Sequence, residues 1–284
     1  MKIVVCIKQV PDTTEIKIDP KTGTLIRDGV PSIMNPDDKS GLEMALQLKD
    51  EKGAHVTVIT MGPPQADLIL REAFAMGVDR AIHLTDRKFA GADTLATSHA
   101  LAGALRKIDF DLLITGRQAI DGDTAQVGPQ VAEKLGIPQI TYAEDVVSAE
   151  KGKIVVKRRL ERGVETVEGK LPMVVTVNAS APECRPRNAK FVMKYKHARA
   201  VSEMQNADED YIALHNNRPY LNIGEWSVND IETKAEELGL TGSPTKVKTI
   251  ENVVFQAKEA KVLEPTDADM SELMKELIAN HTIG

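Results

Sequence analysis

Short apolar runs alternate with helical segments over the first 145 residues of the chain, and this alternation limits the possible folds more than any other feature. Such a pattern is typical of a parallel sheet with helices on both faces. We therefore expect an α/β fold with a doubly wound, mostly parallel sheet. The five predicted strands are Lys2–Lys8, His55–Met61, Arg80–Leu84, Asp111–Thr115 and Gln139–Tyr142.

Turn and capping residues set the expected helix bounds. Asn35 followed by Pro36 and two acids predicts a cap and a helix that ends near Gly53. A second helix is expected from Pro64 to Gly77. A third is expected from about Asp93 to Arg106, with Leu95, Leu101 and Leu105 facing inward. The stretch Thr22–Met34 before the first helix predicts an inserted hairpin that turns at Arg27–Asp28–Gly29.

The pattern changes after residue 150. Alternating polar and apolar residues at Ile154–Leu160, Val164–Leu171 and Met173–Val177 predict a hairpin added to the edge of the sheet. From Ala179 the periodicity fades until a final amphipathic segment, Asp267–Ile278. A tail of this kind with little core of its own is expected to wrap another chain. We accordingly divide the chain into a domain of residues 1–180 and a docking loop with a C-terminal arm, residues 181–284.

The carboxyl ends of the first four predicted strands share one edge of the sheet, where open parallel sheets bind ligands. The most informative stretch there is Thr115–Gln130, in which a buried strand ends, turns and passes into a helix marked by Val127, Val131 and Leu135. Unpaired amides near Gly122 and Thr124 could hold a phosphate. The alternative is an ordinary capped turn.

Two threonines stand near the same edge. Thr94 and Thr97 lie three residues apart on one helix face, so their hydroxyls could reach one ligand. Alternatively, both hydroxyls cap the helix or bond back to it.

Composition and missing motifs exclude several classes of function. The chain has 42 acidic and 36 basic residues, and its net charge of −6 argues against nucleic-acid binding. Two distant cysteines, Cys6 and Cys184, fit a reducing, cytoplasmic location. The sequence has no run of about 18 apolar residues, so we expect no insertion into a membrane. The sequence contains no metal-ligand spacing, Walker loop, Gly-x-Gly-x-x-Gly turn or nucleophile elbow. Without a self-contained catalytic set, the edge is expected to hold a nucleotide cofactor that supplies the chemistry.

One local stretch departs from the acidic average. Six basic residues and His197 lie between Arg185 and Arg199, with no acidic residue among them. This stretch is either a solvated loop or a docking surface for an acidic partner.

Several motifs resemble the beta, or small, subunit of electron transfer flavoprotein over nearly the whole chain. The most specific is Gly116–Arg117–Gln118–Ala119–Ile120–Asp121. The others are Val4–Asp12, Met34–Pro36, Met61–Pro63, Ala75–Arg80 and the hairpin from Val156 to Thr176. One departure is Arg162, where the family usually has a small or acidic residue. Residues 200–225 are also longer than expected for the family.

The resemblance implies a Rossmann-like fold whose sheet edge holds an adenine nucleotide, beside an alpha subunit that carries FAD. One branch of the family holds a structural AMP. The other holds a second FAD, takes electrons from NADH and bifurcates them to ferredoxin and, through the alpha-subunit FAD, to a dehydrogenase. The small or apolar Gly122, Ala125 and Val127 resemble the second branch. The dehydrogenase partner would be an FAD-dependent enzyme of acyl-CoA or hydroxy-acid type.

The resemblance also implies the contact residues. Cys6, Asn35 and Met61 would lie on the adenine side, and Arg117 and Gln118 would approach the flavin ring or ribityl chain. The other implied cofactor contacts are Thr94, Thr97, Gly116, Ala119, Asp121, Gly122, Asp123, Thr124, Gln126 and Val127. The implied docking loop is Arg187, Asn188, Ala189, Lys190, Phe191, Val192 and Met193.

Two alternatives stay open on these grounds. The chain could be an AMP-binding structural subunit of a simple electron carrier, which only the loop composition argues against. It could also be a nucleotide-sensing or nucleotide-hydrolysing domain, but the first strand is followed by Gln9–Val10–Pro11–Asp12 where such a domain needs a Ser-Gly-Gly phosphate loop.

Overall fold

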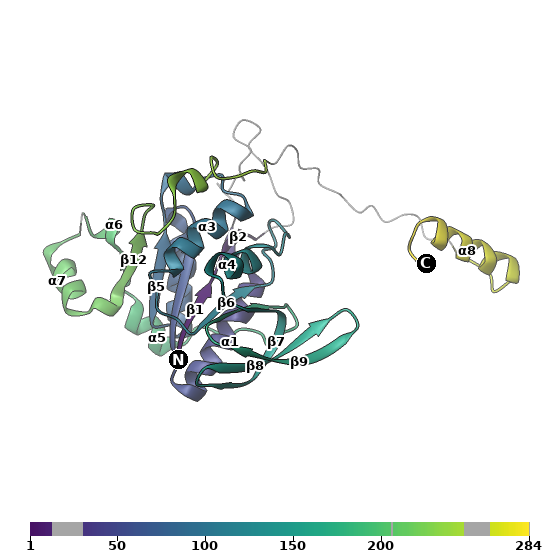
Figure 1. Cartoon of the computed structure of the whole chain (residues 1–284), viewed down its shortest axis with the longest axis horizontal. Helices are drawn as coiled ribbons and strands as arrows, with labels where there is room; N and C mark the ends of the chain where they lie inside the picture. The colour runs from purple at the N-terminus through teal and green to yellow at the C-terminus, as the bar shows by residue number, and fades with distance from the viewer. Residues whose placement is uncertain (13–30, 206, 247–261, 284) are drawn as a thin grey trace. The chain divides into compact units, whose positions relative to one another are not determined.

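The computed structural model describes residues 1–12, 31–205, 207–246 and 262–283. Its described residues form a ten-stranded sheet in the order β11-β12-β5-β4-β1-β6-β10-β7-β8-β9 (Figure 1). All neighbouring pairs from β11 to β7 are parallel, and β7, β8 and β9 are antiparallel. The strands are β1 Lys2–Cys6, β4 His55–Met61, β5 Arg80–Leu84, β6 Leu112–Gly116, β7 Gln139–Glu150, β8 Lys153–Leu160, β9 Gly163–Lys170, β10 Met173–Val177, β11 Arg199–Ala200 and β12 Asn222–Trp226.

Helices cover both faces of this sheet. The helices α1 (Pro36–Lys52) and α2 (Asp67–Met76) share one apolar cluster with the β1 residues Ile3 and Val5. On the other face, α3 (Thr94–Leu105) and α4 (Val127–Leu135) pack with Val4 of the same strand. Successive side chains of a strand point to opposite faces, so β1 contributes to both cores. The doubly wound α/β fold is confirmed.

The termini of the first helix show how local sequence fixes an element. Pro36 occupies the first helical turn, where its missing amide hydrogen costs nothing. Gly53 ends the helix in the left-handed conformation, with φ of 67°, and its amide donates to the Lys49 carbonyl. The expected cap at Asn35 is wrong in one respect: its side chain makes no capping hydrogen bond.

Two strand and packing expectations need correction. Met173–Val177 is not part of the added hairpin, because β10 lies between β6 and β7 and is buried along its whole length. The hairpin consists of β8 and β9 alone, which continue from β7 at the sheet edge (Figure 1). Leu101 and Leu105 are buried as expected, but Leu95 is only partly buried.

The N-terminal insertion is described only in part. Its returning strand β3 (Ser32–Met34) pairs antiparallel with β2 (Gln9–Pro11). The expected turn at Arg27–Asp28–Gly29 lies outside the described residues.

Residues 200–225 are not an exposed loop. They form α6 (Val201–Met204), α7 (Glu209–Asn217), the short helix η3 (Pro219–Leu221) and most of β12, which pairs with β5. Leu221 and Ile223 are buried, so this part of the chain adds to the core. The described contacts divide the chain into units 1–250 and 251–284, whereas the sequence pattern suggested a division after residue 180.

The second unit contains one described helix, α8 (Asp267–Ala279). Its Met270, Met274 and Ile278 recur at helical spacing and are about half exposed. This apolar stripe is the feature that the sequence pattern predicted for Asp267–Ile278. Among the helices of the described ranges, none is both long and apolar enough to cross a bilayer.

Candidate functional site

The carboxyl ends of β1 and β6 meet where the strand order reverses. From β1 the chain builds outward through β4 and β5, and it then returns to place β6 on the other side of β1. At such a point the loops that follow neighbouring strands diverge, which opens a crevice for a ligand. Residues after Cys6 and Gly116 therefore line the candidate site.

A buried carboxylate ties the two strand ends together. Asp38 Oδ2 accepts a hydrogen bond of 2.8 Å from the Lys8 amide, and Asp38 Oδ1 accepts one of 3.0 Å from the Gly116 amide. Burial raises the pKa of Asp38 to about 7, although these two amides and the Lys8 charge oppose the shift. The same burial, with the Asp38 carboxylate nearby, raises the pKa of the Cys6 thiol.

Asn35 fixes the loop that follows β6. Its Nδ2 donates to the Gln118 carbonyl at 2.8 Å, and its Oδ1 accepts from the Ile120 amide at 3.1 Å. Because Asn35 is fully buried, both bonds are shielded from water. Asn35 thus shapes the loop through its side chain instead of presenting a free group.

Lys8 and Asp121 form an ion pair across the crevice, with 2.6 Å between Lys8 Nζ and Asp121 Oδ1. The Asp121 side chain is only 2% exposed. Its second oxygen, Oδ2, is buried and has no hydrogen-bond partner among the described residues. A buried acceptor of this kind suits a hydroxyl or amino group of a bound molecule.

Arg117 shows a second unsatisfied group at the same edge. Its Nε is buried without a hydrogen-bond partner in the described parts of the chain and lies 3.7 Å from Asp37 Oδ2. The guanidinium also lies 5.8 Å from the ring centre of Tyr142, which is partly exposed. A cation beside an exposed ring forms a surface on which a planar, electron-rich ligand could lie.

The loop itself is open. Gly122 has no heavy atom within 4 Å of the position that a Cβ would take, and Gly122, Asp123 and Thr124 are exposed. Asp123 and Ala125 adopt the left-handed conformation, with φ of 49° and 52°. Non-glycine residues adopt this conformation only at some cost, so the surrounding contacts hold the loop in a defined shape.

The helix after the loop begins later than the sequence suggested. Its N-cap is Gln126, so the unpaired amides belong to Val127 and Gly128 and not to residues near Thr124. Thr94 donates from Oγ1 to Gln126 Oε1 at 2.8 Å, which brings the start of α3 to this point. Thr94 therefore does not bond back to its own helix.

The remaining expected residues lie at the same edge. Gly116 is buried at the end of β6, and Met61 ends β4 with its side chain partly exposed. The Ala119 carbonyl accepts from the amides of Gly122 and Asp123. Thr97 lies partly exposed in the first turn of α3, after the capping residue Asp93.

Sequence reasoning missed four residues of this site: Lys8, Asp37, Asp38 and Tyr142. The two acids were visible as first-turn residues of a helix, but nothing in their spacing showed that they reach β1 and β6. Tyr142 lies within β7, and its left-handed φ of 60° left no mark in the sequence pattern.

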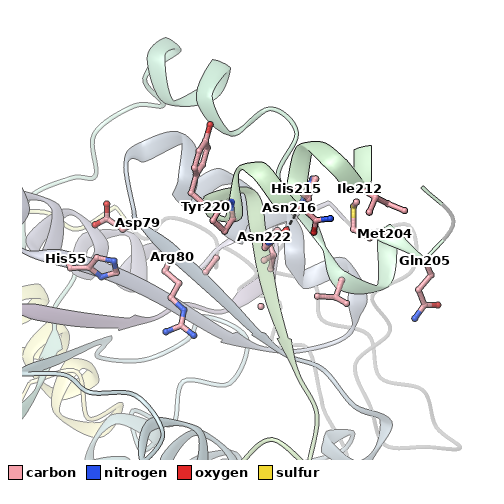
Figure 2. A pocket seen from close by; sticks show the side chains of 15 residues that line it. His55, Asp79, Arg80, Met204, Gln205, Ile212, His215, Asn216, Tyr220 and Asn222 are labelled. Atoms are coloured by element: carbon pink, nitrogen blue, oxygen red, sulfur yellow. Dashed lines mark hydrogen bonds between the residues drawn. The ribbon is translucent and has the colours of Figure 1, made fainter. Parts of the chain in front are cut away.

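A cavity of about 730 Å³ lies at the opposite, amino edge of the sheet. Figure 2 shows His55 and Arg80, which begin β4 and β5, facing it together with Ile212 and Tyr220. None of the cofactor-binding or docking residues predicted from the sequence lines this cavity, and a parallel sheet binds ligands at its carboxyl edge. We therefore place the candidate site at the open loop and not in this cavity.

The basic stretch folds as a short helix, α5 (Ala189–Tyr195), that packs on α2. Tyr195 is buried and stacks on Phe74 at 4.4 Å between ring centres, while Val192 and Met193 are exposed. Arg185 is not a free surface charge, because it pairs with Glu43 and Asp50. A groove of about 400 Å³ between α2 and α5 is lined by Leu68, Arg71, Glu72, Ala75, Arg187, Phe191, Val192, Tyr195 and Lys196.

No cluster of three or more His, Cys, Asp or Glu side chains with metal-binding geometry occurs within the described ranges. The fold and the edge site define a class: a doubly wound α/β protein whose switch-point loop carries unsatisfied polar atoms and open space.

Comparisons with known proteins narrow this class. The family model described as the electron transfer flavoprotein domain matches residues 22–203. The chain is 46% identical over 283 residues to an electron transfer flavoprotein subunit beta of Clostridium acetobutylicum, with all of both chains covered. It is 47% identical over 249 residues to the caffeyl-CoA reductase–Etf complex subunit CarD of Acetobacterium woodii, covering 87% of this chain and 86% of that one. The protein FixA of Azorhizobium caulinodans is 41% identical over 288 residues, covering 97% and 94%.

The chain belongs to the electron transfer flavoprotein family, among its beta subunits. As a beta subunit, it has an alpha subunit as partner.

Proposed function

We propose that this chain is the FAD-binding beta subunit of an electron-bifurcating electron transfer flavoprotein. In this function it takes electrons from NADH and passes them to ferredoxin and, through the alpha-subunit FAD, to an FAD-dependent dehydrogenase of acyl-CoA or hydroxy-acid type. The observation that carries the proposal is the open loop after β6, where Arg117 Nε and Asp121 Oδ2 are buried without hydrogen-bond partners among the described residues. The proposed cytoplasmic location rests on the two distant free cysteines.

The described side chains fit an adenine dinucleotide. Asp121 Oδ2 can accept from a ribose hydroxyl or an adenine amino group, and the amides of Val127 and Gly128 can donate to phosphate oxygens at the start of α4. Open space beside Gly122 leaves room for a ligand longer than a mononucleotide. FAD, when bound, supplies the exchange between paired and single electrons that the chain's own residues lack.

Arg117 is the residue through which the chain would tune a flavin. Its guanidinium lies beside the half-exposed Tyr142 ring and is only partly compensated by Asp37, 3.7 Å away. Burial raises the pKa of Asp37, in opposition to its hydrogen bond from Gln118 and the Arg117 charge. A positive charge held in this way would favour negative charge on a ligand ring.

A second function rests on the same site. An AMP-binding structural subunit of a simple carrier would use the same loop and the same unsatisfied atoms. The relative CarD, whose name places it in a caffeyl-CoA reductase–Etf complex, favours a dehydrogenase-linked complex for this chain too but does not choose between the two nucleotides.

The docking surface for the dehydrogenase is proposed at Arg187–Met193. Val192 and Met193 are 43% and 64% exposed, on a helix anchored by buried Tyr195. Arg187 and Lys190 form no ion pair within the described ranges, which leaves their charges for an acidic partner. Met193→Glu should abolish electron transfer to the dehydrogenase without loss of bound nucleotide, whereas Leu160→Glu on the distant hairpin should leave transfer unchanged.

The decisive experiment is the nucleotide content of the purified complex of this chain with its alpha subunit. Bound nucleotides are released by denaturation, and FAD and AMP are quantified by chromatography. Two FAD per heterodimer without AMP is the expected result. One FAD with one AMP would instead assign the structural function, and the bifurcating proposal would be dropped.

A variant pair locates the nucleotide. Gly122→Asp together with Val127→Thr should lower the FAD content by crowding its diphosphate, and Gly122→Ala is the matched control because a Cβ there meets nothing. Unchanged flavin stoichiometry in the double variant would place the ligand elsewhere.

A further inference from the structure

Residues 227–246 form a strap that runs along the outer side of α3 (Figure 1). The Glu232 amide donates to the Gly103 carbonyl at 3.0 Å, and Thr233 Oγ1 donates to the His99 carbonyl at 2.9 Å. Gly103 allows this close approach, because a Cβ there would collide with Thr233. The strap buries Ile231 and Leu238 in the core beneath it. It is therefore a packed part of the first unit.

The strap ends at the residue that caps the helix it covers. Asp93, the N-cap of α3, accepts from the Ala96 amide through Oδ1 at 3.0 Å. Its Oδ2 accepts from Thr245 Oγ1 at 2.7 Å and from the Thr245 amide at 3.1 Å. The Asp93 amide in turn donates to Ser243 Oγ at 2.8 Å. One carboxylate thus caps the helix and anchors the end of the strap.

The first residue of α3, Thr94, reaches the candidate nucleotide loop. Thr94 Oγ1 donates to Gln126 Oε1, and Gln126 is the N-cap of the helix after that loop. Thr245 is thus hydrogen-bonded to Asp93, and the peptide bond links Asp93 to Thr94, which is hydrogen-bonded to Gln126. Beyond the strap, the chain continues into the second compact unit, residues 251–284.

We propose that Asp93 is a positioning residue that couples the C-terminal part of this chain to the nucleotide site, so that bound nucleotide and an anchored strap stabilise each other. The inference rests on the proposed function in so far as the loop holds an adenine nucleotide. Through this link, a partner that binds the C-terminal segment would change the affinity of the site for the nucleotide. Coupling of this kind acts in both directions.

The chain offers a clean variant for the test. Asn is as good an N-cap as Asp, so Asp93→Asn keeps a cap on α3. A side-chain amide has only one acceptor oxygen, so when Oδ1 of Asn caps the Ala96 amide, its Nδ2 can donate to Thr245 Oγ1 but cannot accept from the Thr245 amide. Thr245→Val removes the hydroxyl from the other side of the contact. Thr233→Val is the matched control, because it removes a strap hydrogen bond of the same kind that does not involve Asp93.

The primary measurement is the rate at which nucleotide leaves the purified complex with the alpha subunit, followed by chromatography of released FAD and AMP. We expect Asp93→Asn to release nucleotide roughly five- to tenfold faster than wild type, as loss of hydrogen bonds to a charged group would allow. Thr245→Val, which retains the backbone amide bond, should have a smaller effect of about two- to threefold. Thr233→Val should match wild type.

The direction of the effect separates coupling from simple electrostatics. Removal of a negative charge near an anionic ligand would slow its release, whereas loss of the anchor accelerates it. The reciprocal readout is tryptic cleavage after Lys246, at the end of the strap. Saturating FAD should protect this bond in wild type and in Thr233→Val but not in Asp93→Asn.

Equal release rates in wild type, Asp93→Asn and Thr245→Val would overturn the coupling while leaving the proposed function intact. Slower release from Asp93→Asn, or protection of Lys246 in that variant, would also overturn it. A wild-type complex with neither FAD nor AMP at this chain would overturn both proposals together.

Discussion

The Gly116 amide donates to Asp38 Oδ1 at 3.0 Å, although the two residues are 78 positions apart in the chain. This bond joins the end of β6 to the first turn of α1. The other oxygen of Asp38 holds the Lys8 amide after β1, so one carboxylate spans the two loops that diverge at the switch point. The shape of the candidate site depends on this contact.

Gly116→Ala should displace the loop. A Cβ at Gly116 would lie 2.8 Å from Asp37 Cβ and 2.9 Å from the Asp38 amide nitrogen, and helix backbone cannot yield cheaply. We expect a loss of about 1–3 kcal/mol of stability and at least tenfold weaker nucleotide retention. Gly122→Ala, whose added Cβ meets no atom of the chain within 4 Å, serves as the control for stability. Thermal unfolding and dialysis of the complex measure the two effects, and equal behaviour of both variants would refute this account of the loop.

The stability of the fold should depend on pH through Asp38. Because burial raises its pKa to about 7, the folded chain binds this proton more tightly than the unfolded chain. The protonated Asp38 carboxyl therefore contributes to the stability of the fold. This contribution is complete below the ordinary carboxyl pKa of about 4 and is lost as the pH rises to about 7. Relative to the Asp38→Asn variant, the free energy of unfolding of the wild type should fall by up to about 1.4 kcal/mol per pH unit in this window. Chemical denaturation at several pH values tests this, and parallel curves for the two proteins would contradict it.

The Lys8–Asp121 pair should contribute more than an exposed pair. Lys8→Met leaves the 2%-exposed Asp121 carboxylate without its counter-charge, and we expect a loss of about 1–3 kcal/mol, since Lys8 itself is partly exposed. Asp121→Asn in the same chain should restore part of this loss, which a double-mutant cycle would show. The exposed pair of Lys2 with Asp109 should contribute much less, because water screens both charges. Similar coupling energies for the two ion pairs would show that the burial of Asp121 does not strengthen its pair with Lys8.

Arg185 should anchor the segment that leads to α5. Its guanidinium donates to both Glu43 oxygens, and Glu43 is buried. Arg185→Met should therefore cost about 2 kcal/mol, because the Glu43 carboxylate would be left buried and unpaired. Arg187→Met, two residues further on, removes an exposed charge and should leave the melting temperature unchanged. Equal melting temperatures for the two variants would show that the Glu43 contact contributes nothing.

Local sequence was sufficient for the elements of the first half. Strand and helix patterns placed β4 and β5 at the residues observed, and Asn35–Pro36 and Gly53 marked both ends of α1. Parallel strands share their carboxyl edge, so the same patterns also located the candidate site. The predictions of the strands and helices succeeded because helix and strand periods, turn residues and helix ends are properties of short stretches.

Strand order was beyond the reach of these patterns. Met173–Val177 follows a hairpin in the sequence and was assigned to it, yet β10 lies between β6 and β7. A short apolar run has the same local period in a central strand and in an edge strand. Its burial along the whole strand comes from neighbours that lie far away in the sequence.

Sequence patterns alone were enough to predict the class of fold, and they pointed to the sheet edge and the loop Gly116–Val127 that we propose as the nucleotide site. The folded structure shows which distant residues meet: Asp38 with Lys8 and Gly116, and Asn35 with Gln118, at this loop, and Asp93 with Thr245 at the start of α3. Each of these contacts joins residues separated by 30 to 152 positions. Such contacts depend on strand order and helix packing, which follow from the burial of the whole chain and not from the periodicity of any one segment.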